Sequence, residues 1–482
     1  MFSTTRVTRR GFLGVCGGLV LSHAVVCGAA AEKTFRAGVA VRDITPEPGA
    51  SLAGHMRDRK ATHAHDPLKV RCLVLDDGAT MLAFVTVDSC MAPREIFDDA
   101  KARIQESCGI PAQNMLMAAT HSHTAPSVVS LFQTDPVPGY DATVVAAIVD
   151  GVCEACGTLA PAQIAYGSGS VPDQVFNRRW YMKPGGIPAN PFGETTDKVR
   201  MNPPRASEDL LEPSGPTDPE VPFIALRHKD GRPLAVLANY ALHYVGGTDA
   251  GAMSADYFGC FADKLTALLA PEESGMPFVA MLTNGASGNI NNINFREAAV
   301  SREPYDQMNL VAEKVSTEVY RAYQKIVFQD HAVLKAQTQE ITLGTRLPGE
   351  AEINRAQTIV DAAESEEMKT LEEVYARETL LLQDYSSEVT VPLQALRIGD
   401  VAVTAIPCEV FVETGLHLKE TSPFSKTIPI ELANGYYGYL PTAEQHALGG
   451  YETWRARSSY LEVHAADKIE AKLKSMLHVI SG

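Results

Sequence analysis

Residues 114–126 read Asn-Met-Leu-Met-Ala-Ala-Thr-His-Ser-His-Thr-Ala-Pro, and this stretch carries signals for both the fold and the site. Its first six residues form an apolar run that predicts a buried strand. The run leads into His121 and His123, which are separated by one residue. Open α/β sheets usually hold functional groups at the carboxyl ends of their strands, and histidine is the commonest metal ligand. The stretch therefore predicts a metal or acid–base site at the end of a strand.

Apolar and amphipathic segments alternate along the rest of the chain. Apolar runs predict strands at residues 35–44, 70–75, 81–87, 221–226, 233–242, 277–282 and 389–406, and helical periodicity covers residues 94–107, 141–156, 256–269, 302–325 and 465–477. No internal repeat is present. This alternation predicts an α/β fold with mixed β-sheets and surrounding helices, organised as a single large catalytic domain.

Two segments depart from this alternation. Residues 348–385 combine helical periodicity with dense charge, which predicts a solvent-exposed helical hairpin inserted into the domain, without a chemical role. Residues 168–220 are rich in proline, glycine and asparagine and show little periodicity, so we expect a long loop that is functional or mobile.

The N-terminus resembles an export signal. Residues 8–13, Thr-Arg-Arg-Gly-Phe-Leu, form a twin-arginine motif, and the three alanines at residues 29–31 supply a cleavage site. The stretch between them contains several glycines and is too weakly apolar to favour a membrane anchor. We predict a twin-arginine signal peptide at residues 1–31, a mature domain at residues 32–482, and a periplasmic or secreted protein.

The composition limits the partners. The sequence has 58 acidic against 42 basic residues and a net charge of −16, which argues against nucleic acid as a partner. No segment after the signal reaches the roughly 20 apolar residues of a membrane span, so we expect no integral membrane segment after signal cleavage. A small-molecule or lipid substrate remains the expected partner, and the oligomeric state stays open.

Seven cysteines follow the predicted signal peptide, and their odd number argues against a complete disulfide framework. Cys153 and Cys156 have the spacing of zinc knuckles and redox motifs, but no second C-x-x-C completes a four-cysteine zinc site. Both lie in the helix predicted at residues 141–156, so we expect structural thiols on its core side. Whether these two are bonded stays open.

Three further apolar runs end in polar groups that could share a site with His121. Residues 236–243 end in His243, residues 401–409 end in Glu409, and residues 434–441 hold a cluster of tyrosines. Two histidines, a carboxylate and another oxygen donor suit Zn²⁺ in an open catalytic site. A lone histidine at a strand end is more often a hydrogen-bonded structural residue than a ligand, and Glu409 alone could be a surface acid.

Together these residues carry a family resemblance. Residues 120–126 resemble the Thr-His-Thr-His-Ser-Gly-Pro motif of the neutral/alkaline non-lysosomal ceramidases. Further elements similar to that family follow in its order: residues 176–179 (its Asn-Arg-Ser-Pro), 239–243 (its second histidine strand), 406–409 (its Pro-Gly-Glu), 434–442 (its tyrosine element) and 451–452 (its Tyr-Glu). The resemblance extends from about residue 37 to residue 460.

The resemblance implies a ligand set and a substrate-facing set. The implied ligands of one Zn²⁺ per chain are His121, His243, Glu409 and Tyr439, and the implied neighbours of the substrate are His123, Arg178 and Tyr451. Residues two apart on an extended strand share a side, so we expect one histidine of the motif on the metal and the other toward the substrate carbonyl. Arginine and tyrosine there would stabilise a developing oxyanion.

The chain departs from the family pattern at two places. Asn291 aligns with the family's serine, and an amide can donate a hydrogen bond but cannot act as a nucleophile. We therefore expect attack by metal-bound water, with Asn291 as a polar residue of the catalytic site and the neighbouring Gly-Asn loop as an oxyanion cradle. The family usually carries a C-terminal β-sandwich domain, which we do not expect in a chain that ends at Gly482.

The leading hypothesis is an exported zinc-dependent hydrolase that cleaves a linear N-acyl amide bond, as a ceramidase does in sphingolipid metabolism. The first alternative is a metallohydrolase, an esterase or lactonase, for a more polar substrate such as a sugar ester or lactone. Asn291 and the expected lack of a β-sandwich favour that alternative. The second alternative, of another class, is a non-catalytic periplasmic protein that binds a metal or ligand.

Overall fold

The computed structural model describes residues 34–270 and 277–482. The predicted signal peptide at residues 1–31 lies outside the described residues. Residues 34–482 form one compact unit. Within the part of the chain that the structure describes, no helix has the length and hydropathy needed to cross a membrane.

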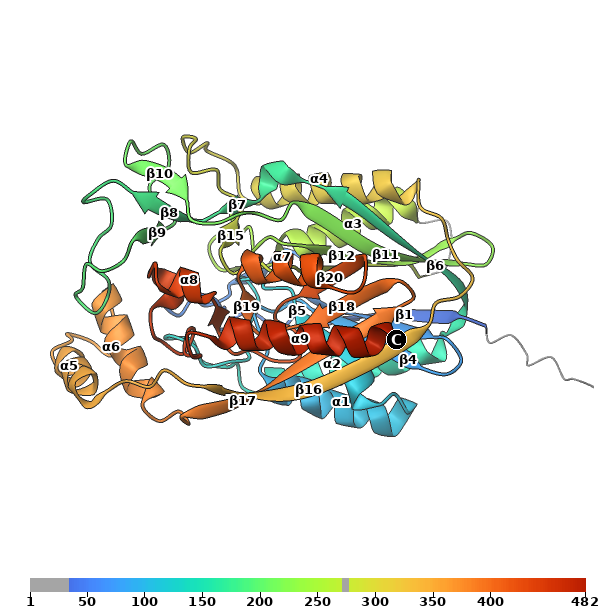
Figure 1. The fold of residues 1–482 in the computed structure, drawn as a ribbon, viewed down its shortest axis with the longest axis horizontal. Helices are drawn as coiled ribbons and strands as arrows, with labels where there is room; N and C mark the ends of the chain where they lie inside the picture. The colour runs from blue at the N-terminus through green and yellow to red at the C-terminus, as the bar shows by residue number, and fades with distance from the viewer. Residues whose placement is uncertain (1–33, 271–276) are drawn as a thin grey trace, which may run out of the picture. The chain divides into compact units, whose positions relative to one another are not determined.

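An eight-stranded mixed sheet forms the centre of the molecule (Figure 1). In spatial order its strands are β14 (Val279–Asn284), β12 (Pro233–Tyr240), β11 (Glu220–His228), β6 (Ala160–Ser170), β1 (Arg36–Asp43), β3 (Lys69–Asp76), β4 (Met81–Val87) and β5 (Met115–Ala119). Most neighbours are antiparallel, but β12 pairs with β14 and β4 pairs with β5 in parallel. The inner strands are near-continuous apolar runs because both faces of the sheet are covered.

Four helices cover one face of this sheet. They are α1 (Arg94–Cys108) and α2 (Tyr140–Gly157), which pack on β1, β3 and β4, and α3 (Asp256–Leu269) and α4 (Asp306–Tyr323), which pack on β6, β11, β12 and β14. Their buried side chains recur at helical spacing, as Ile96, Ala100 and Ile104 do in α1.

A second, four-stranded sheet packs on the other face of the first. It consists of β16 (Leu334–Gly344), β17 (Glu388–Ile398), β18 (Val401–Ala405) and β20 (Lys426–Ile430), and its outer face carries α9 (Ala465–Ser481). Side chains of both sheets, such as Phe84 and Val403, share one buried core. The architecture is therefore helix–sheet–sheet–helix, which confirms the predicted α/β class with mixed sheets.

The two edges of the eight-stranded sheet approach each other. The segment after β20 joins them: Ala119 of β5 donates its N–H to the carbonyl of Leu432, and Glu431 donates its N–H to the carbonyl of Asn284 of β14. Residues that follow the two edges of the sheet are thereby brought to one place.

Short elements complete the fold. They are β2 (His63–Ala64) with β13 (Ala252–Met253), β7 (Phe176–Asn177) with β15 (Ile290–Asn291), β19 (Glu409–Val410) with β21 (Tyr439–Leu440), the sheet β10 (Leu210–Pro213), β8 (Arg179–Met182) and β9 (Val199–Met201), and the helices α7 (Val412–Thr421) and α8 (Ala443–His446). The sheet of β8, β9 and β10 lies within residues 168–220, so this segment is not the single long loop that we expected.

Residues 348–385 contain α5 (Glu350–Asp361) and α6 (Leu371–Leu382), which pack against each other. The expectation that both are solvent-exposed was wrong for α6. Tyr375 and Glu378 of this helix are buried, and the carboxylate of Glu378 accepts hydrogen bonds from the guanidinium of Arg457. Because the segment is rich in charged residues, the sequence pattern did not indicate the apolar face of α6 or its buried ion pair.

Candidate metal centre and active site

His121 lies two residues beyond β5, in a loop and not on an extended strand as expected. Its φ of 71° places it in the left-handed region, which is uncommon for a residue with a side chain. Nδ1 of its ring donates to the carbonyl of Cys90 at 2.8 Å. Because Nδ1 carries the proton, Nε2 presents a lone pair to the interior, and such backbone bonds orient metal-binding histidines in proteins.

Nε2 of His121 faces Nε2 of His243 at 2.9 Å. His243 follows β12, near the other edge of the large sheet, so the closure of the sheet brings the two rings together. Burial, followed by the charges of His121 and Arg178, lowers the pKa of His243 well below its usual value. A neutral imidazole is the form that binds metal ions.

Glu409 completes a set of three converging donors. Its Oε2 lies 3.5 Å from Nε2 of His121 and 3.6 Å from Nε2 of His243. This oxygen is buried and has no hydrogen-bond donor among the described residues. Its other oxygen accepts a hydrogen bond from the hydroxyl of Tyr436 at 3.0 Å. An orphaned carboxylate oxygen beside two imidazole nitrogens is a donor set that fits a divalent cation such as Zn²⁺.

Tyr439 lies beside this set. It is the direct partner of Glu409 in the parallel pairing of β19 with β21. Its hydroxyl accepts a hydrogen bond from Arg178 at 3.2 Å. Burial, and then the carboxylate of Glu409, raises the pKa of Tyr439 well above its usual value. The structure thus brings together all four residues that the resemblance implied as ligands.

Arg178 is held rigidly at the same site. Besides Tyr439, its guanidinium donates to Glu452 at 2.8 Å and to the carbonyl of Gly288 at 2.7 Å. Glu452 also accepts from the neighbouring Arg179 at 2.6 Å. Burial alone would raise the pKa of Glu452, but the guanidinium groups of Arg179 and Arg178 hold it below its usual value. Glu452 is thus shared between two guanidinium groups, so its single negative charge does not neutralise both. Arg178 keeps part of its positive charge facing Tyr439.

Tyr451 and His123 flank the donor set from two sides. The ring of Tyr451 lies 5.8 Å from that of Tyr439, between centroids. Nε2 of His123 lies 3.2 Å from Nε2 of His121, so both histidines of the motif reach one site although the backbone is not extended there. Burial, and then the charge of His121, lowers the pKa of His123 well below its usual value.

The sequence did not point to the residues that fix the ring of His123. The ring of Tyr244 stacks on it, with centroids 3.6 Å apart and an angle of 15°. On another side lies Gly54, where a Cβ atom would stand 2.4 Å from Nδ1 of His123. His55 contacts the carbonyl of His123 through Nε2, at 3.1 Å. The position of Tyr244 directly after His243 was the one sequence feature that could have indicated its role. Gly54 and His55 are distant from His123 in sequence, so no local pattern indicated theirs.

The side-chain amide of Asn291 makes two hydrogen bonds within the protein. Its side-chain N–H donates to Oδ1 of Asn202 at 2.8 Å, and its Oδ1 accepts from the backbone N–H of Ile293 at 2.9 Å. Both ends of the amide are thus engaged, one by its own loop and the other by Asn202, which is distant in sequence. Nearby, the hydroxyl of Ser287 donates to the buried carboxylate of Glu431 at 2.5 Å.

In the Gly-Asn loop, which we expected to form an oxyanion cradle, the amide of Gly288 has a partner within the protein. The N–H of Gly288 donates to the carbonyl of Val410 at 2.7 Å, and a Cβ atom at this glycine would stand 2.6 Å from the carbonyl oxygen of Glu409. Gly288 therefore allows the loop to pack against the strand that carries Glu409, and its amide is committed to that contact.

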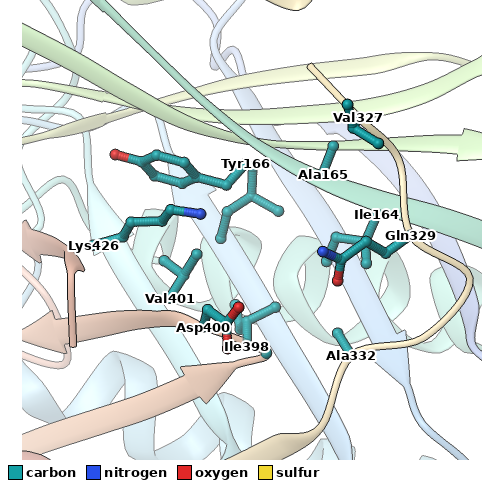
Figure 2. A pocket seen from close by; sticks show the side chains of 12 residues that line it. Ile164, Ala165, Tyr166, Val327, Gln329, Ala332, Ile398, Asp400, Val401 and Lys426 are labelled. Carbon is teal, nitrogen blue, oxygen red and sulfur yellow. The ribbon is translucent and has the colours of Figure 1, made fainter.

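Two cavities border the site. One, of about 210 Å³, is lined by Tyr451 and mainly by apolar side chains, including Met56, Ile187, Leu371 and Trp454. Another, of about 510 Å³, is lined by His55, Met56, Arg57, Asp58, Arg59 and Glu367. A third, of about 260 Å³, lies between β6 and the turn from β17 to β18, with Lys426 and Tyr166 in its wall (Figure 2). None of our candidate site residues lines this third cavity.

Two histidines and a glutamate, backed by an arginine and tyrosines at the ends of sheet strands, form the kind of site that metal-dependent hydrolases use. The chain belongs to the neutral/alkaline non-lysosomal ceramidases: the model of that family's N-terminal region matches residues 35–301. The family consists of hydrolases. In this chain, the buried side chains of His121, His243 and Glu409 could bind a metal ion.

Solved structures agree with this assignment at the level of the fold. The crystal structure of neutral ceramidase from Pseudomonas aeruginosa is similar with a TM-score of 0.70 and 18% sequence identity, over 93% of this chain and 74% of that chain. A structure described as ceramidase complexed with C2 is similar with a TM-score of 0.71 and 16% identity, over 93% of this chain and 75% of that one.

Proposed function

We propose that this chain is an exported zinc-dependent hydrolase that cleaves the N-acyl amide bond of a ceramide-like lipid with water as the nucleophile. The observation that carries the proposal is the orphaned Oε2 of Glu409, which faces Nε2 of both His121 and His243. These three side chains, with Tyr439, would hold one Zn²⁺ per chain. A bound Zn²⁺ supplies polarisation of the substrate carbonyl and a lowered pKa for water.

The neighbouring side chains would handle the charge and the proton. We assign Arg178 and the hydroxyl of Tyr451 to the stabilisation of negative charge on the carbonyl oxygen by fixed donors. His123, whose Nε2 lies 3.2 Å from Nε2 of His121, would take a proton from the attacking water and return it to the leaving amine. Ser287, the hydroxyl of the Gly-Asn loop, is buried and donates to Glu431, so we assign the attack to water and not to this side chain.

The apolar cavity beside Tyr451 supports an amphiphilic substrate, because ligand sites are mostly apolar with a few polar groups that set the orientation. The second candidate is an esterase or lactonase for a more polar substrate, such as a sugar ester or lactone. The cavity lined by Arg57, Asp58, Arg59 and Glu367, which adjoins His55, favours it.

Metal analysis and a substrate panel test the proposal. We expect about one zinc per chain, lost in both His121→Ala and Glu409→Gln and retained in the exposed control His478→Ala. The panel compares N-acyl sphingoid bases with sugar esters and lactones. Turnover of only the water-soluble compounds would replace the ceramide assignment by the second candidate. A folded native protein that binds no zinc and hydrolyses nothing would reject the enzyme hypothesis in favour of a binding protein.

Export is tested separately. Replacing Arg9 and Arg10 together by lysine should retain the chain in the cytoplasm and leave the activity of the purified protein unchanged. Release of the double variant to the periplasm or medium at the native level would contradict the twin-arginine assignment.

A further inference from the structure

Three thiols meet between α1 and α2, the two helices that cover the half of the large sheet leading to His121 and His123. Cys108 is the last residue of α1, whereas Cys153 and Cys156 lie in the last turns of α2. The Sγ atoms of Cys108 and Cys153 are 2.7 Å apart. All three side chains are only partly buried, so small reagents can reach them.

We infer that Cys108 and Cys153 form a site of covalent modification: a disulfide that joins α1 to α2. The two residues come from different helices that pack against each other, so their sulfurs can meet without distortion of either helix. The proposal is independent of the hydrolase function.

The alternative pairing within the C-x-x-C motif is disfavoured by helix geometry. Side chains three apart on a helix have Cβ atoms about 5–6 Å apart, whereas a disulfide needs about 3.5–4.5 Å. Cys153 and Cys156 could pair only if the end of α2 unwound. The motif therefore supplies one partner for Cys108 and leaves Cys156 as a thiol.

The bond would form by exchange with an external disulfide, such as oxidised glutathione. Two electrons pass from the sulfurs of Cys108 and Cys153 to the external disulfide, one protein disulfide forms, and two small thiols leave with the two protons. Burial raises the pKa of Cys153 to about 12 and also raises that of Cys108. Thiolate is the attacking form, so these raised pKa values make the exchange slow.

The bridge would close a covalent ring around the functional motif. The segment between Cys108 and Cys153 contains β5 and both histidines, His121 and His123. Cross-linking restricts the unfolded chain, so oxidation should stabilise the segment that carries these histidines.

The test is peptide mapping of the full chain, folded and incubated with oxidised glutathione, under non-reducing conditions. We expect a peptide pair linked through Cys108 and Cys153, which disappears on reduction, and a melting temperature several degrees higher in the oxidised form. Cys156→Ser should keep both the linked peptides and the thermal shift, whereas Cys153→Ser and Cys108→Ser should lose both. A bond between Cys153 and Cys156, glutathione adducts without a cross-link, or three freely alkylated thiols would each overturn the inference.

Discussion

Glu409 and Tyr439 lie directly opposite each other in the parallel pairing of β19 with β21. The carboxylate of one and the phenol of the other are therefore presented by one rigid backbone unit. Tyr436, three residues before Tyr439, holds the remaining oxygen of Glu409 through its hydroxyl. The two tyrosines therefore differ in their contact with Glu409. Tyr439 lies beside the donor set, and Tyr436 orients the carboxylate of Glu409.

The first prediction concerns Tyr436. Tyr436→Phe should keep the fold but release Oε1 of Glu409, and loss of such an orienting hydrogen bond typically costs about 10–100-fold in metal affinity or activity. Zinc titration against a competing chelator measures the effect. Tyr437→Phe is the matched control, because the hydroxyl of Tyr437 donates to the carbonyl of Thr390 and does not contact the donor set. Equal affinities in the two variants would contradict the assigned role.

The second prediction concerns Gly54. Gly54→Ala adds a Cβ atom 2.4 Å from Nδ1 of His123 and should displace that ring, so we expect a fall in kcat with zinc retained. Gly139→Ala is the control: Gly139 has a comparable φ of 76°, but no atom lies within 4 Å of the added Cβ. Alanine at Gly139 is strained by the same left-handed backbone conformation, but its Cβ atom meets no neighbouring side chain. Matching kcat values would mean that His123 tolerates movement.

The third prediction concerns the pH dependence of stability. The pKa of Glu452 is lowered in the folded state, so its ion pairs stabilise the protein fully above its unfolded pKa, near 4.5, and are lost as the pH falls through the lower folded value. Glu452→Gln leaves buried Arg178 and Arg179 without their carboxylate, which should cost about 3–5 kcal/mol at neutral pH. Denaturant unfolding at pH 7 and below pH 4.5 should show the gap between variant and native protein narrowing in acid. If the difference in the free energy of unfolding between the two proteins does not change with pH, Glu452 is not the group that titrates.

The fourth prediction concerns Asn291. Because its amide is bonded to Asn202 and Ile293, Asn291→Ala should retain measurable turnover, with the main loss in stability. Single-turnover kinetics on zinc-loaded protein measure this. Complete loss of turnover in a folded, zinc-loaded variant would show that Asn291 acts in the chemical step.

The sequence predicted which strand ends meet, because polar residues after apolar runs mark such ends. His121, His243 and Glu409 were found in this way. The supports of His123 could not be found, since the stacking of Tyr244 and the close approach of Gly54 depend on loop paths that no local pattern encodes. The buried face of α6 was missed for a related reason: Tyr375 and Glu378 are buried by residues far away in sequence, while the surrounding charges are typical of a solvated helix.

The closure of the large sheet has a consequence for folding. Its edge strands would otherwise offer unpaired backbone groups, which are templates for aggregation. The segment at Glu431 and Leu432 binds one such group at the end of each edge strand. His121 follows one edge of the sheet and His243 lies near the other, so their nitrogens meet only when the two edges are joined. A metal ion would then bind after the sheet has assembled and stabilise the assembled structure. Metal uptake in a refolding experiment would report completion of the tertiary structure, not the earlier growth of separate sheet halves.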